Sequence, residues 1–182
     1  MENCLIWFRN DLRLDDNHTI SLCLKNNYKV LPVYIIDDSM LIGSSSKWWL
    51  KNSLKSLNKS MGDNLVIQRG DPRKILEHLI QKYKISHVCW NARYSKDEIL
   101  EDSLIEKAIV KQGLKIHIYH STLLRNPNQT LKKDGTPFKV YTPFYKQKYS
   151  DLKYESYDYD PKTLEYVQTS GNEDNNSLID KT

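Results

Sequence analysis

The sequence predicts an α/β protein in which helices cover both faces of a parallel sheet. Short apolar runs of four to eight residues recur along the chain, and amphipathic stretches of helical length separate them. The chain has 182 residues, which suits one compact domain with a tail. We therefore expect a doubly wound sheet of five strands, Rossmann-like, with a flavodoxin-type or related strand order.

Five segments have the length and composition of buried strands, at residues 4–8, 30–36, 64–68, 87–90 and 115–119. Helices are predicted between them. The first begins near Asp16 or Asn17, and the second follows possible caps at residues 44–46. Asp71 and Pro72 predict the start of the third helix, and the fourth spans residues 96–112 and stops at Gly113.

The pattern changes after the fifth strand. Residues 124–143 contain three prolines and a Lys-Asp-Gly turn, which predicts a loop or hairpin. Residues 151–182 are polar and carry eight acidic against three basic residues, which is typical of a linker or frayed tail. We therefore place the domain at residues 1–150 and an acidic tail at residues 151–182.

Composition excludes several classes of protein. No apolar stretch approaches the length of a membrane span and no signal-peptide pattern follows Met1, so we expect a cytoplasmic protein with no membrane association. The three cysteines lie in apolar patterns without metal-ligand spacing and are interpreted as reduced core residues, with no metal site. The first 150 residues carry a charge of +9, but the scattered lysines favour a solvated surface over a nucleic-acid patch.

The end of the first strand has an unusual sequence for a ligand-binding edge. Ligands of doubly wound sheets bind outside the carboxyl ends of the strands, and Arg9 and Asn10 stand at such an end. The six glycines have neither the dinucleotide nor the P-loop spacing. Arginine and aspartate alternate after this strand. Asp11 and Arg13 are expected to stabilise the turn through ion pairs, whereas Arg9 is the charged residue expected to face a ligand.

Six motifs in order resemble the photolyase and cryptochrome family. They are WFRNDLRLDDN, VLPVYIID, WWLKNSL, RGDP, WNARY and KVYTPF, and the resemblance covers roughly residues 4–150. In that family, photolyases use light and a reduced flavin to split pyrimidine dimers in DNA. The flavin sits in a second, helical domain, whereas the N-terminal α/β domain commonly holds an antenna chromophore, namely folate, deazaflavin or FMN.

The resemblance implies that this chain is the antenna-binding domain of a deoxyribodipyrimidine photolyase. Damaged DNA and FAD would be bound by a helical domain, in the same polypeptide or as a separate chain. The resemblance assigns no catalytic residue to this part of the family's fold, and we expect no repair by these 182 residues alone. A cryptochrome-like photoreceptor or interaction module is the alternative, and a nucleotide-binding domain is a third possibility.

Candidate chromophore-binding residues follow from matching positions in the family. Folate-binding members have an Asn-Glu pair where this chain has Asp97 and Glu98, although carboxylates at a helix start also have a purely structural use. Deazaflavin-binding members use positions that fall on the segment 35–37 and on the loop after the fourth strand. The full set of candidates is Arg9, Ile35, Ile36, Asp37, Lys47, Arg93, Tyr94, Asp97 and Glu98. Of Trp48 and Trp49, one is expected in the core and the other at the cleft or at a second domain.

Overall fold

The computed structural model describes residues 1–38, 42–150, 152, 158–169 and 178. Its main sheet is parallel, in the order β3-β2-β1-β4-β5. The strands are β1 Asn3–Phe8, β2 Lys29–Ile36, β3 Val66–Arg69, β4 His87–Asn91 and β5 Lys115–Tyr119. The predicted α/β fold is confirmed, and the order is the Rossmann one among those that the sequence left open.

Four helices connect the strands, at α1 His18–Lys25, α2 Ser44–Ser60, α3 Pro72–Lys82 and α4 Lys96–Val110. The predicted caps at Asn17 and Asp71 are confirmed, because each side chain accepts from the backbone N–H two residues on. The predicted serine cap of α2 is wrong, since Gly43 occupies that position without a side-chain bond. Among the described residues, no helix has the length and apolar composition needed to cross a bilayer.

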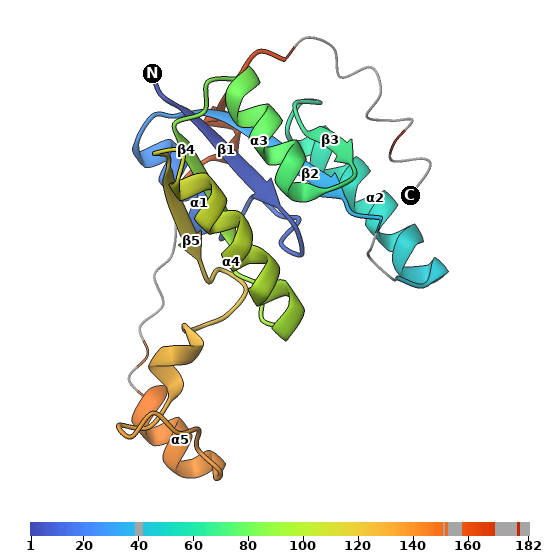
Figure 1. Ribbon diagram of the computed structural model, residues 1–182. Coiled ribbons are helices and arrows are strands. Elements are labelled where there is room, and N and C mark those ends of the chain that lie inside the picture. The colour runs from blue at the N-terminus through green and yellow to red at the C-terminus, as the bar shows by residue number, and fades with distance from the viewer. Residues whose placement is uncertain (39–41, 151, 153–157, 170–177, 179–182) are drawn as a thin grey trace.

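The strand residues divide between two apolar layers, one on each face of the sheet. Figure 1 shows helices α3 and α4 together in front of the sheet. Cys4, Ile6 and Phe8 of β1 pack against α1 and α2, whereas Leu5 and Trp7 pack against α3 and α4. Successive strand residues point to opposite faces, so a strand buried on both sides is apolar throughout. This is why the central strands lack the polar alternation of a half-exposed sheet.

The segment after β5, predicted as a loop, also contains a helix. A 3-10 turn at Pro127–Thr130 precedes α5, Tyr141–Lys148, and Figure 1 shows α5 standing away from the sheet. Pro143 lies in the first turn of α5, where a missing N–H costs no helical hydrogen bond. Val140, Tyr141 and Tyr145 are exposed along this segment. The prolines that predicted a loop are thus compatible with a short helix.

Part of the predicted tail belongs to the sheet. Strand β6, Glu165–Tyr166, pairs in parallel with the first residues of β2. Strand β3 pairs with the last residues of β2 on the same side. Leu164 is buried among the residues that pack around α1 and α2. The Tyr159 hydroxyl accepts from the Asn17 N–H at 2.9 Å and donates to the Leu14 carbonyl at 2.8 Å. Residues 158–169 therefore close one side of the domain, which their acidic composition did not indicate.

Candidate functional site

Arg9 lies buried at the carboxyl edge of the sheet, between the ends of β1 and β4. Its guanidinium stands 4.4 Å from the centroid of the Trp7 ring and donates to Asp102 Oδ1 at 2.6 Å and to the Asn91 carbonyl. Only 6% of the side chain is exposed. Burial lowers the pKa of Arg9 to about 10, although Asp102 opposes that shift. Arg9 is thus held by protein groups and is almost fully buried.

A second arginine, Arg93, completes an ionic cluster with Arg9, Glu101 and Asp102. Arg93 donates to Asp102 Oδ1 and to Glu101 Oε2, each at 2.5 Å, and lies 3.9 Å from Glu98 Oε1. Burial by itself lowers the pKa of Arg93, but the hydrogen bonds to Asp102 and Glu101 outweigh it and raise the pKa. Asp102 therefore joins two guanidinium groups, and the cluster links α4 to β1 and β4.

Buried amides and a carboxylate organise the turn that follows β1. Asp11 accepts from the Arg9 N–H at 3.1 Å and from Asn91 Nδ2 at 2.5 Å, and Asn91 Nδ2 also donates to Asn17 Oδ1 at 3.0 Å. Arg13 donates to the carbonyls of Asp15, Asp16 and Ser121. As predicted, Asp11 and Arg13 stabilise the turn, but through hydrogen bonds to amides and carbonyls.

The topological switch point is therefore filled by side chains. In the order β3-β2-β1-β4-β5 the direction of winding reverses between β1 and β4, where ligands of such folds commonly bind. In this chain Arg9, Asn91 and Asp102 occupy that position. Any ligand of this sheet edge must bind beside the cluster.

An open hollow lies beside it, between the turn after β1 and the first half of α2. Its volume is about 690 Å³, within the range of small-molecule sites. The wall combines aromatic and apolar side chains with hydroxyls, amides and the edge of the cluster. The lining residues are Arg9, Asn10, Asp11, Leu12, Arg13, Tyr34, Ile42, Ser45, Ser46, Trp49, Leu50 and Ser53.

The two adjacent tryptophans are both at the surface. Trp48 is 63% and Trp49 is 69% exposed, so the prediction that one of them lies in the core is wrong. The reason is that α2 buries Leu54 and Leu57 only in its second half, whereas residues 44–49 are exposed throughout. Trp49 lines the 690 Å³ hollow and also a neighbouring one of about 770 Å³, whereas Trp48 lines only the latter.

Comparisons with known proteins decide the family. The family model described as DNA photolyase matches residues 4–164. The deoxyribodipyrimidine photo-lyase of Agrobacterium fabrum is 35% identical over 146 residues, which are 78% of this chain and 30% of that protein. Cryptochrome-2 of Arabidopsis thaliana also matches, at 26% identity over 84% of this chain and 26% of its own length.

The chain belongs to the DNA photolyase family.

Solved structures agree with this assignment. A class III photolyase from Agrobacterium tumefaciens has a TM-score of 0.83 at 30% identity, covering 98% of this chain and 38% of its own. An archaeal photolyase from Sulfolobus tokodaii, described with two FAD molecules that imply a novel light-harvesting cofactor, has a TM-score of 0.72 at 26% identity, over 99% of this chain and 42% of its own. This photolyase-family chain thus spans about a third of the length of the relatives it matches.

The candidate residues at the end of β2 and in α2 lie in two separate places. Ile36, Asp37 and Lys47 line a small hollow of about 90 Å³ between the end of β2 and α2, together with Arg69. Ile35 points to the opposite face of the sheet and is buried in the layer with Trp7. Adjacent strand residues cannot share a face, so Ile35 and Ile36 do not meet at one surface.

Three of the four candidates after β4, Arg93, Tyr94 and Glu98, contact other side chains of the chain. Glu98 and Ser95 form a reciprocal capping box at the start of α4, with bonds of 3.2 and 3.4 Å. Burial raises the pKa of Glu98, but the Ser95 bonds and Arg93 outweigh it and hold the pKa below its usual value. Asp97 is exposed in the same turn, and the Tyr94 hydroxyl lies 2.9 Å from His120 Nδ1.

Sequence reasoning missed two buried residues that bind Arg9 at the edge of the sheet, Asn91 and Asp102. Asn91 ends β4 inside the WNARY motif, but local sequence gives an amide at a strand end no particular role. Asp102 precedes Ile105 by three residues and Ile109 by seven, so all three lie on the same face of α4. This is the face that the helix buries. A carboxylate on an apolar stripe is the signal that could have identified it, because buried charges are normally paired.

Proposed function

We propose that this chain is the N-terminal domain of a deoxyribodipyrimidine photolyase and holds a light-harvesting chromophore in the 690 Å³ hollow. The observation that carries the proposal is the hollow itself, at the carboxyl edge of the sheet beside the filled switch point. Light-driven repair of pyrimidine dimers would then require a helical FAD-binding domain, in the same polypeptide or as a separate chain. That domain would also provide the contacts with damaged DNA.

As the antenna chromophore, the site favours a flavin nucleotide over folate. Tyr34, Trp49 and Leu50 offer an aromatic and apolar wall for a flat ring. Ser45 and Ser46 lie in the first turn of α2, which has no side-chain cap, so its N–H groups and the neighbouring Lys47 suit a phosphate. Glu98, the acceptor that a pteridine would need, is already used by Ser95 and Arg93. The Sulfolobus photolyase described with two FAD molecules supports the same choice.

Chromophore binding can be tested directly on the purified chain. It is titrated with FMN, FAD, a deazaflavin and a reduced folate, and near-ultraviolet and blue absorption is followed together with quenching of tryptophan fluorescence. Loss of stacking on Trp49 is worth roughly 1–1.5 kcal/mol, so Trp49→Ala should weaken flavin binding about 10-fold. Trp48→Ala is the matched control, since Trp48 lies outside this hollow. Equal effects of both variants, or no binding of any chromophore, would contradict the proposal.

Repair is tested separately after reconstitution. The chain is combined with the helical domain of a photolyase relative, and splitting of pyrimidine dimers is measured in light and in darkness. Light-dependent splitting supports the repair function and excludes a purely signalling role of the cryptochrome type. Splitting by this chain alone would overturn the proposed division of labour between the two domains.

A further inference from the structure

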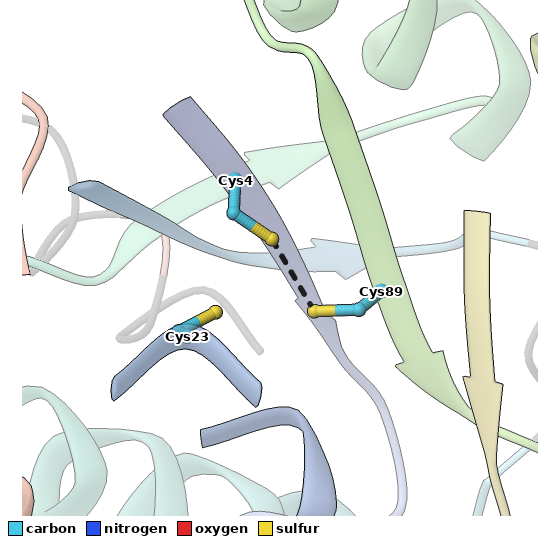
Figure 2. A group of neighbouring side chains, drawn as sticks. All are labelled: Cys4, Cys23 and Cys89. Atoms are coloured by element: carbon cyan, nitrogen blue, oxygen red, sulfur yellow. Dashed lines mark hydrogen bonds between the residues drawn. The ribbon is translucent and has the colours of Figure 1, made fainter. Parts of the chain in front are cut away.

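Three cysteines that are distant in the sequence meet in the core. Cys4 of β1, Cys23 of α1 and Cys89 of β4 have sulfur atoms that all lie within 4.8 Å of one another. Figure 2 shows the three side chains turned toward a common centre, with Cys4 Sγ and Cys89 Sγ 3.6 Å apart. No local motif marks this group, and for that reason the sequence predicts only separate core cysteines without a metal.

The spacing of the sulfur atoms suits one ion bound by all three. Thiolates bind a metal at about 2.3 Å in zinc sites, which places three sulfurs around one ion about 4 Å apart. The three thiols of this group need only small side-chain shifts to reach that arrangement. A buried cysteine alone behaves as a small apolar residue, but three thiols at one point form a soft ligand set.

Coordination number and charge select the kind of ion. Among the described residues the group has three ligands without a fourth, whereas structural zinc takes four. The surrounding layer is apolar, with Ile6 and Ile20 among its members. Three thiolates leave two negative charges with Cu(I) and one with Zn²⁺, but none with a trivalent ion. Since a net charge in an apolar core is costly, the neutral complex is favoured.

We propose that Cys4, Cys23 and Cys89 form a buried three-thiolate site for a soft, three-coordinate trivalent ion, for which arsenic(III) is the probe. Arsenite enters as As(OH)₃, and three As–O bonds are replaced by three As–S bonds. Each thiol gives its proton to a departing hydroxyl, so three waters leave and no atom changes oxidation state.

Access to the site requires movement of α1. The three cysteines are at most 1% exposed, and Cys23 sits in a helix of eight residues. Local opening of such a short element costs less than global unfolding. Uptake should therefore be slow, and it should accelerate in urea below the unfolding transition.

The test uses the reduced, full chain and sodium arsenite. Native mass spectrometry should show one arsenic replacing three hydrogens, and X-ray absorption should show three sulfur neighbours. Cys23→Ala should weaken binding by more than about 100-fold, beyond the usual loss for an outer-shell partner. Ser21→Ala is the control, because Ser21 is buried on the same helix but lies outside the thiol group.

Several results would overturn this proposal. They are no uptake by the wild-type chain, uptake that survives in Cys23→Ala, and binding of Zn²⁺ or Cu(I) to the three thiols more tightly than arsenite. If Cys23→Ala does not fold, Cys89→Val serves in its place. Arsenite should then raise the melting temperature of the wild type and leave that of the folded variant unchanged.

Discussion

The ionic cluster under the sheet edge makes a sharp prediction about Asp102. Asp102→Asn removes the charge that two guanidinium groups share, at hydrogen-bond lengths of 2.6 Å to Arg9 and 2.5 Å to Arg93. The side chain of Arg9 is 6% exposed and Asp102 is its ion-pair partner in the described structure, so a buried cation would lose the carboxylate that binds it. Breaking such a pair costs about 3–5 kcal/mol.

This cost is large against the stability of an ordinary domain. At roughly 2–4 °C per kcal/mol for a chain of this size, the melting temperature should fall by about 6–20 °C. Urea unfolding followed by circular dichroism measures the free energy directly. Glu101→Gln is the matched control, since Glu101 contacts the same Arg93 with 34% of its side chain exposed, and should cost less than about 1 kcal/mol.

A double variant separates the cost of an unpaired charge from the worth of the pair. Arg9→Met combined with Asp102→Leu removes both charges and keeps apolar volume, so it should be more stable than Asp102→Asn alone. If Asp102→Asn costs no more than Glu101→Gln, the cluster contributes nothing beyond a surface ion pair. The view that buried ion pairs hold the filled switch point together would then be refuted.

Two further predictions concern the tail and the start of α4. Leu164→Ala should destabilise the domain by about 2–5 kcal/mol because Leu164 is buried beside β6, and an unchanged urea midpoint would show that the tail is not part of the core. Glu98 has a pKa below its usual 4.5, so its stabilising effect is present above pH 4.5 and is lost as pH falls through the lowered value. The stability difference between wild type and Glu98→Gln should thus shrink from pH 7 to pH 3. A constant difference across that range would contradict the capping interaction.

Local rules predicted most of the regular elements. The five strands of the main sheet and the caps at Asn17 and Asp71 follow from apolar runs and from side chains that bond a neighbouring N–H. Helix α5 and strand β6 were missed for two different reasons. Pro143 is tolerated in a first helical turn, and the pairing of β6 with β2 joins segments about 135 residues apart that carry no local signal.

The sequence by itself determined the fold class, the family motifs and the absence of glycine-rich phosphate loops, because periodicity and spacing are local properties. Only the tertiary structure decided that Arg9 faces Asp102 instead of solvent, that both tryptophans of α2 are exposed, and that three distant cysteines meet. Each of these three observations depends on which elements become neighbours in the sheet and on where a helix extends past the edge of the sheet. Such contacts are set by packing between elements, and no stretch of sequence contains both partners.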